Sequence, residues 1–282
     1  MPHATRTVGR TEIAVCCDGV VTAGGTPAEA FPTVPAEVWD ISLPRFPDTR
    51  SSDGQWQLHI HCHLVRTQDA VVLIDTGVGP ASAPAFDWTG AEGRLLADLE
   101  AAGVDPREVD AVAISHVHDD HLGWTLTPEA TPVFPNARYV LQRADWDFIH
   151  AGLEPEDADI AARTLDPLLD AGVLDLLDGN TRLTPTLRLR HEPGHTPGHQ
   201  IAVVEDGGDT ALLSADVTNH PAQLGDPTRY GTTDADPELA NATRARVLAE
   251  AADAGWVVST AHYADAFGRF VRRGEAYDWE TV

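Results

Sequence analysis

A six-residue segment, 116–121, holds three histidines and two aspartates in the order HVHDDH. It follows an apolar run, 111–114, that predicts a buried strand, with only Ser115 between them. Histidine is only occasionally fully buried, and aspartate almost never is unless it is paired or bound to a metal. Imidazole nitrogen and carboxylate oxygen are ligands for zinc and related transition metals. The segment therefore predicts a metal site, and a solvated polar loop is the alternative.

Three later segments also place a histidine or an aspartate just after a predicted strand: His195 in PGHTPGH, Asp216 in SAD and His262 in AH. In α/β folds, ligand sites gather at the carboxyl ends of strands. A single histidine after a strand is more often a hydrogen-bonded structural residue. Four such segments in one chain instead predict a shared site.

The elements that must position these residues alternate along the chain. The sequence predicts strands at 11–21, 58–66, 71–75, 110–115, 138–142, 187–191, 201–205, 210–214 and 256–260, and helices at 90–102, 144–150, 237–254 and 267–273. Interleaved strands and helices imply an α/β architecture with two sheets and outer helices. We expect a single domain at 58–282, with residues 1–57 packed on it as an N-terminal extension.

Composition limits the partners. The chain has 44 acidic residues against 19 basic ones, all arginine, for a net charge of −25. Such a surface repels phosphate backbones and anionic lipids, so we expect no nucleic-acid or membrane partner. The first ten residues are not followed by the apolar segment of a signal peptide, and Cys16, Cys17 and Cys62 form no disulfide pattern. A cytoplasmic protein, monomeric or homodimeric, with a small-molecule substrate is expected.

The order HVHDDH, PGHTPGH, SAD and AH resembles the pattern of the metallo-β-lactamase superfamily, HxHxDH followed by H, D and H. The resemblance extends from about Leu58, includes the IDTG of residues 74–77, and leaves the first 57 residues uncovered. It implies an αββα four-layer sandwich with a binuclear centre, usually of zinc, at one edge of the two sheets. It assigns His116, His118 and His195 to one metal, Asp120, His121 and His262 to the other, and Asp216 to a bridge between them.

Within the superfamily, the residues favour a small-molecule hydrolase. Many true β-lactamases have a cysteine, or no bridging carboxylate, where Asp216 stands, and redox di-iron members have a glutamate at the position of His118. The nuclease branches carry extra segments and basic surfaces that are absent from this sequence. The segments HLGW, FPNARY and DVTNHP resemble the branch of N-acyl-homoserine lactonases and methyl parathion hydrolase. The quorum-quenching lactonases of that branch typically have a tyrosine where this chain has Asn219. Asparagine can donate only a weaker, neutral hydrogen bond to a substrate carbonyl.

The resemblance implies hydrolysis of a lactone, an ester or a phosphotriester by a metal-bridging hydroxide. Zinc lowers the pKa of bound water from 15.7 to about 7. Asp120 is the expected proton shuttle as well as a ligand, with a purely structural role as its alternative, and Asn219 and His220 are candidates for substrate contact. Manganese, cobalt or iron could replace zinc.

Two other functions stay open. One is a non-hydrolytic or biosynthetic member of the fold, cyclase-like or thioesterase-like. The other is a glyoxalase II-like thioester hydrolase, for which only Arg269, Arg272 and Arg273 could supply a basic binding region.

Several aromatic residues and histidines have two interpretations. Trp124, Phe134 and Trp146 could line an apolar pocket or belong to the core. His59, His61 and His63 share one face of a strand, which favours hydrogen-bonded or solvent-facing histidines over a third metal site because no carboxylate completes the set. His191 and His199 are expected to be structural. Tyr263 could orient either His262 or a substrate.

Overall fold

In the computed structural model, which describes residues 4–152 and 154–282, the strands form two seven-stranded sheets. The first sheet has the order β1-β2-β3-β4-β5-β6-β7. Its strands are β1 (Ala4–Val8), β2 (Thr11–Thr22), β3 (Gln57–Arg66), β4 (Val71–Ile74), β5 (Ala111–Ala113), β6 (Arg138–Gln142) and β7 (Leu174–Leu177). The strands from β4 to β7 run parallel to one another, so their carboxyl ends meet at one edge of the sheet.

The second sheet has the order β14-β13-β12-β11-β10-β9-β8. Its strands are β8 (Thr181–Thr184), β9 (Leu187–His191), β10 (Gln200–Asp206), β11 (Asp209–Leu213), β12 (Val257–Ser259), β13 (Gly268–Arg273) and β14 (Ala276–Thr281). Only β11 and β12 pair in parallel. Both end near the edge at which the first sheet delivers segment 116–121.

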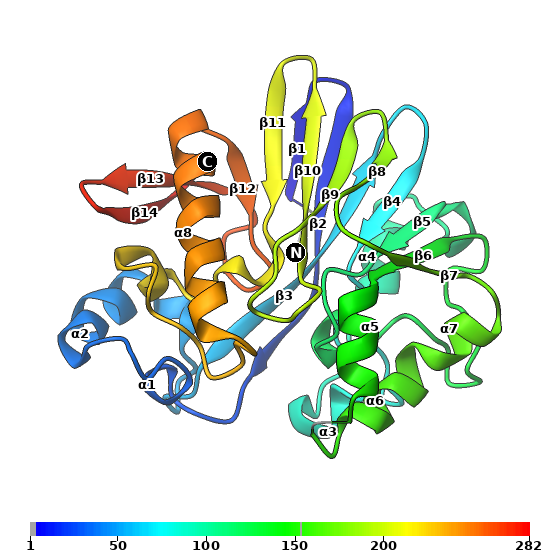
Figure 1. Ribbon diagram of the computed structural model, residues 1–282, viewed down its shortest axis with the longest axis horizontal. Helices are drawn as coiled ribbons and strands as arrows, with labels where there is room; N and C mark the ends of the chain where they lie inside the picture. Colours follow the sequence, from blue (N-terminus) through cyan, green and yellow to red (C-terminus); the bar gives the residue numbers. More distant parts are fainter. Residues whose placement is uncertain (1–3, 153) are drawn as a thin grey trace.

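Helices cover the outer face of each sheet (Figure 1). Helices α4 (Leu95–Ala101), α5 (Arg143–His150), α6 (Asp157–Thr164) and α7 (Asp166–Asp170) lie on the side of the first sheet, and α8 (Pro237–Ala254) lies on that of the second. Short helices α1 (Pro27–Ala30), α2 (Ala36–Arg45) and α3 (Phe86–Thr89) lie near the strand ends. No helix within the described residues is long and apolar enough to cross a membrane.

Three apolar layers hold this sandwich together. One lies between the sheets, with Val65 and Ile74 from the first facing Leu189 and Leu213 from the second. The other two lie between each sheet and its helices. Hydrophobic residues alternate along the inner strands as the period of two requires. The predicted αββα sandwich is confirmed.

Two predicted elements differ from the structure. Residues 267–273 were expected to be a helix, but 268–273 form β13, which pairs with β14 around Gly274 at φ +68°. Phe270 is buried between exposed Arg269 and partly exposed Val271, so the local period is two. The helix expected at 90–102 is shorter than predicted, because only α4, Leu95–Ala101, is helical.

The first 57 residues contribute two strands to the first sheet. Strand β2 pairs with β3 along its length, from Glu12 opposite Arg66 to Thr22 opposite Gln57. Residues 1–3 lie outside the described part of the chain. The division at residue 57 therefore runs through a continuous sheet.

Candidate metal centre

The four candidate ligand segments converge at one edge of the sandwich. Potential ligand atoms of His116, His118, His195 and Asp216 all lie within 4.8 Å of one another. Those of a second group, Asp120, His121 and His262, meet the same limit. In the first group, Nδ1 of His118 lies 3.0 Å from Nε2 of His116 and 3.0 Å from Nε2 of His195. All seven predicted ligands are thus brought together in two groups.

The carboxylate of Asp216 lies between these groups. Its Oδ2 is 3.3 Å from Nε2 of His195 in the first group and 3.0 Å from Nε2 of His262 in the second. Its Oδ1 is 3.4 Å from Nε2 of His121. A carboxylate in this position can offer one oxygen to each of two cations.

Two buried atoms support cation binding on structural grounds. Nε2 of His121 and Oδ1 of Asp216 have no hydrogen-bond partner among the described residues. Leaving such atoms buried and unpaired costs about 1–3 kcal/mol each, more when the group is charged. Both atoms point into the space between the ligand groups, where a divalent cation would satisfy them. The donor set, imidazole with carboxylate, fits zinc or a related ion.

The loop that follows β4 holds the histidines of the first sheet. Asp75 accepts from Nδ1 of His121 at 2.9 Å and from the backbone and hydroxyl of Ser115 at 2.6 and 2.7 Å. The hydroxyl of Ser115 lies 2.9 Å from Nδ1 of His116. Fixing Nδ1 leaves Nε2 of both imidazoles free for a metal.

A close backbone contact fixes the same loop against the ligand segment. The amide of Gly123 donates to the carbonyl of Gly77 at 2.7 Å. A Cβ atom at position 123 would lie 2.1 Å from the backbone carbon of Val78. Only glycine permits this approach, which explains the glycine of the HLGW segment. The glycine of the IDTG segment, Gly77, has φ +67°, and a Cβ atom there would lie 2.1 Å from Oδ2 of Asp18.

The histidines of the second sheet are held differently. Nδ1 of His195 donates to Asp234 at 2.8 Å, and Asp234 in turn pairs with the buried guanidinium of Arg244 at 3.1 Å. Nδ1 of His262 donates to the carbonyl of His59 at 3.0 Å. His199, expected to be structural, accepts at Nε2 from the backbone of Asp216 at 3.1 Å.

Burial and charge set the protonation states. Burial and neighbouring histidines lower the pKa of His116 and of His118 well below the usual value, so both are neutral, as metal ligation requires. Burial also opposes the charge on His121, but Asp120, Asp216 and Asp75 outweigh it and raise the pKa of His121 to about 10. The same carboxylates would stabilise a divalent cation bound to the second group.

A cavity of about 650 Å³ opens above the two groups. His118, Asp120, Asp216 and His262 lie in its wall together with Asn219. Apolar side chains make up another part of the wall: Trp56, Leu58, Trp88, Val117, Phe148, Ile149 and Ile160. The acidic lining is extensive: Asp87, Asp119, Asp120, Glu154, Glu156, Asp157, Asp159, Asp216 and Asp234. Among the described lining residues there is neither arginine nor lysine.

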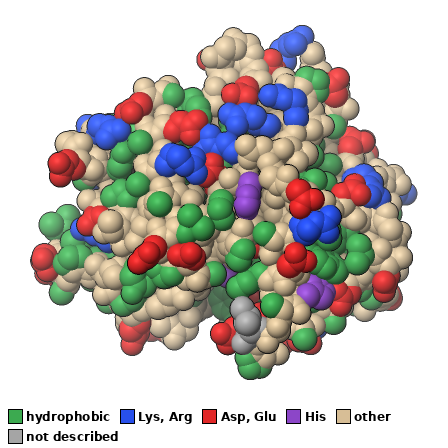
Figure 2. Space-filling model, in the orientation of Figure 1, with side chains coloured by type: hydrophobic (Ala, Val, Ile, Leu, Met, Phe, Trp, Pro, Cys, Tyr) green, Lys and Arg blue, Asp and Glu red, His purple; other side chains and the backbone are tan. Residues whose placement is uncertain are grey.

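Arginines gather elsewhere on the molecule. Figure 2 shows most of those on the visible face in its upper half, whereas acidic and apolar side chains dominate the lower edge, where α1, α3 and α6 lie. Arg269, Arg272 and Arg273 lie on β13, and the last two pair with acidic residues at the surface. The expected basic substitute for a glutathione site is therefore absent from the described cavity wall.

Several candidate substrate residues do not reach the cavity wall. Phe134 is completely buried in the core beneath the first sheet, and Trp124 and Trp146 pack against that core. His220 is buried between the rings of Phe31 and Trp39, at centroid distances of 5.6 and 5.1 Å. Its Nδ1 accepts from the backbone of Ala222, so its position favours a structural role.

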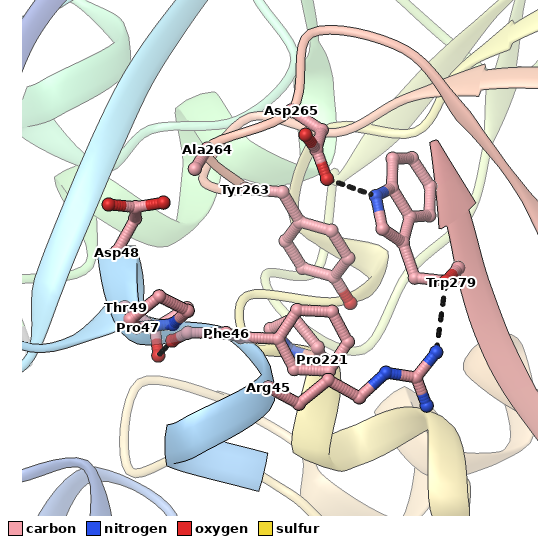
Figure 3. A pocket seen from close by; sticks show the side chains of 10 residues that line it. All are labelled: Arg45, Phe46, Pro47, Asp48, Thr49, Pro221, Tyr263, Ala264, Asp265 and Trp279. Carbon is pink, nitrogen blue, oxygen red and sulfur yellow. Dashed lines mark hydrogen bonds between the residues drawn. The ribbon is translucent and has the colours of Figure 1, made fainter. Parts of the chain in front are cut away.

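Tyr263 faces a different cavity from His262. Its ring borders a smaller cavity of about 170 Å³ that Arg45, Pro221 and Trp279 also line (Figure 3). Its hydroxyl donates to Thr218 at 3.0 Å. Asp119, beside the candidate ligands in the HVHDDH segment, is partly buried and accepts from the indole of Trp88 at 2.9 Å.

Asp145 is a positioning residue that the sequence did not reveal. It lies on α5, is completely buried, and accepts from the hydroxyl of Thr196 at 2.8 Å and the backbone of Gly198 at 2.5 Å, on either side of the turn after His195. Burial raises the pKa of this carboxyl to about 6, even though these hydrogen bonds oppose the shift. The buried charge therefore destabilises the fold at neutral pH.

The Asp145→Asn variant should show this penalty in its pH dependence. A folded pKa near 6, above the usual 3.8, means that the wild type loses stability as pH rises from about 4 to 6. Asparagine keeps an acceptor for Gly198 and can donate to Thr196, but it does not titrate. Relative to wild type, the variant should gain about 2–3 kcal/mol over that interval. Urea unfolding at pH 4, 5, 6 and 7 measures this difference, and a constant difference would contradict the assignment.

Comparisons with known proteins agree with this geometry. The model of the metallo-β-lactamase superfamily matches residues 56–262. An N-acyl homoserine lactonase of a Bacillus species is 28% identical over 181 residues, which cover 57% of this chain and 64% of that protein. The N-acyl homoserine lactonase AttM of Azorhizobium caulinodans is 28% identical over 254 residues, 81% of this chain and 91% of the relative.

A solved structure, described as AidC, a dizinc quorum-quenching lactonase in complex with a product, has the same fold. The two chains align with a TM-score of 0.84 and 23% sequence identity. The alignment covers 99% of this chain and 97% of the lactonase chain. Because the family model matches most of the chain and the ligands converge as its pattern requires, the chain belongs to the metallo-β-lactamase superfamily.

Proposed function

We propose that this protein is a binuclear metal-dependent hydrolase that opens the ring of a neutral lactone carrying an apolar acyl chain. The observation that carries the proposal is the cavity, whose wall combines both ligand groups with a set of apolar and aromatic side chains. The relatives named N-acyl homoserine lactonases support the same substrate class. Esters and phosphotriesters remain secondary candidates for the same centre.

We assign the ligands as the convergence suggests, with His116, His118 and His195 at one ion, Asp120, His121 and His262 at the other, and Asp216 at both. Zinc is the favoured metal. Two divalent ions supply Lewis acidity and a water of lowered pKa. Asp120 lies in the cavity wall, where its carboxylate can accept a proton and return it to the leaving alkoxide.

The acidic lining decides against a glutathione thioester. Glutathione conjugates carry carboxylates, and like charges in a cavity of low dielectric repel one another strongly. Arg163 pairs with Asp87 and Asp159, and Arg244 pairs with Asp234, so three of the nine carboxylates are already paired with arginines from outside the cavity wall. Within the wall itself, no described cationic side chain could bind a distant glycine carboxylate. A neutral lactone avoids this repulsion, and the complete ligand set favours catalysis over a non-hydrolytic role.

Hydrolysis assays on the zinc-loaded protein test the proposal. N-hexanoyl and N-decanoyl homoserine lactone should be opened with a kcat/KM at least about 100-fold above that for S-lactoylglutathione, a difference of about 2.7 kcal/mol in transition-state stabilisation. An aryl ester serves as a generic control. Faster hydrolysis of the thioester, or two bound metals without any lactone hydrolysis, would overturn the assignment.

Asn219 is the residue we assign to substrate orientation. Its Nδ2 donates to Oδ2 of Asp216, and an amide nitrogen has a second hydrogen for a substrate carbonyl. The Asn219→Ala variant should lower kcat by about 10-fold or more, because one donor to the developing charge is lost. The exposed Asn136→Ala variant is the matched control. An unchanged kcat for Asn219→Ala would remove Asn219 from the mechanism.

A further inference from the structure

A second set of metal-binding side chains lies between the sheets, outside the binuclear centre. Ligand atoms of Cys17, His59 and His61 lie within 4.8 Å of one another. From sequence, a third metal site at His59, His61 and His63 was disfavoured because no carboxylate completed the set. The structure supplies a thiol from the neighbouring strand.

A β-bulge brings the thiol into place. The register of β2 against β3 shifts between Cys17 and Gly19, and Cys17 lies directly opposite His61. Directly opposed residues of an antiparallel pair have Cβ atoms about 4.5–5.5 Å apart. Cys17 continues the inner face of Ile13 and Val15, so the thiol and the imidazoles share the space between the sheets.

The imidazole nitrogens are available for ligation. Nδ1 of His61 lies 3.2 Å from the carbonyl of Thr260, so it donates there and leaves Nε2 as an acceptor. Nε2 of His59 is buried without a hydrogen-bond partner among the described residues, and the His59 side chain is only 8% exposed. His63, in contrast, is satisfied by Ser259 at 2.7 Å. Burial lowers the pKa of His61 to about 3, so this imidazole is neutral.

We propose that Cys17, His59 and His61 form a third metal site, which binds zinc or another thiophilic divalent cation with water as a fourth ligand. Tetrahedral zinc with one sulfur and two nitrogens requires ligand separations of about 3.3–3.7 Å, so from separations within 4.8 Å a shift of about 1.5 Å at most completes the site. The negative charges of Asp48 and Asp265 near His59 favour a cation. Cys17 is partly exposed, which leaves a route for the ion and the water.

The third site would be connected to the binuclear centre by hydrogen bonds to the segment that holds His262. The carbonyl of His59 accepts from Nδ1 of His262, and the amide of His61 donates to Ala261 at 3.0 Å. A metal that fixes His59 and His61 therefore also fixes the segment that carries His262.

Cobalt substitution distinguishes this site from the binuclear centre, because only this group contains sulfur. The cobalt-loaded wild type should bind three ions per chain and show a thiolate-to-cobalt charge-transfer band in the near ultraviolet. Cys17→Ser should lose the band and one ion while keeping two. Cys62→Ala, which removes a buried thiol from the opposite face of β3, should keep both the band and the third ion.

The absence of the band from the wild type, or its persistence in Cys17→Ser, would overturn the proposal. If Cys17→Ser does not fold, alkylation of the wild type with iodoacetamide replaces it. Zinc should slow modification of Cys17 by at least about 10-fold, and an unchanged rate would also overturn the proposal. Neither the cobalt spectrum nor the alkylation rate depends on hydrolysis, so failure of this proposal would be distinguishable from failure of the lactonase assignment.

Discussion

The Asp216→Asn variant is expected to bind at most one divalent ion at the binuclear centre and to lose lactone hydrolysis by more than about 100-fold. Loss of an outer partner of a metal ligand typically costs 10–100-fold, and this change removes an oxygen that faces both ligand groups. Oδ2 of Asp216 lies 3.0 Å from His262 in the second group and 3.3 Å from His195 in the first. The carboxylate of Asp120 lies 3.7 and 3.8 Å from His121 and His262, both of the second group, so it does not take the place of Asp216 between the groups. Metal content by mass spectrometry and kcat/KM for N-hexanoyl homoserine lactone measure the effect.

Asp119→Asn provides the matched control. Asp119 lies in the same cavity wall but belongs to neither ligand group. That variant should keep its metal content at the binuclear centre. Two ions there in Asp216→Asn would show that the carboxylate is not the bridge.

The Arg244→Met variant is expected to be the most destabilising single change. The Arg244 side chain is 1% exposed and donates to the carbonyls of Val217, Pro227 and Arg229, to the Asn241 side chain, and to the carboxylate of Asp234. Methionine fills a similar volume but leaves these acceptors buried and unpaired. Removing one partner of a buried ion pair costs about 3–5 kcal/mol.

The loss should extend to metal binding, because Asp234 also holds Nδ1 of His195. Chemical unfolding in chelator gives the loss of folding free energy alone, and repetition in zinc adds the loss of affinity. Arg107→Met, which breaks an exposed pair with Asp105, should change the unfolding midpoint little. An Arg244→Met midpoint equal to that of Arg107→Met would contradict the structural role.

The convergence of the seven candidate ligands could be predicted because each follows a strand in a short, distinctive segment. The sequence indicated the role of Asp75 only weakly, through its place in the IDTG segment directly after β4. Nothing in the sequence indicated that Asp234 and Asp145 position the site. Asp234 lies in an irregular loop and Asp145 on a helix, and each reaches its partner across more than 35 residues of chain, a contact that no local pattern encodes.

The first strand and the final hairpin were harder to predict than β2, whose predicted range, 11–21, ends one residue short of the observed one. In β1 only Val8 is buried and the three residues before it are all exposed, so the sequence shows no alternation of apolar and polar residues by which a strand is recognised. In β13 three arginines obscure the alternation around Phe270. The long helix α8 was predicted to the residue, from Pro237 to Ala254, because Pro237 is typical of a helix start and Gly255 of the position just past a helix end.

The division of ligands between the sheets has a consequence for stability. His116, His118, Asp120 and His121 follow β5 of the first sheet, whereas His195, Asp216 and His262 come from loops of the second. Under the proposed ligand assignment, each ion would take ligands from both halves of the sandwich, and neither half alone would offer a complete set. The ions would then link the two sheets, so a motion that separates the sheets would have to release both ions, and the free energy of metal binding would add to that of folding.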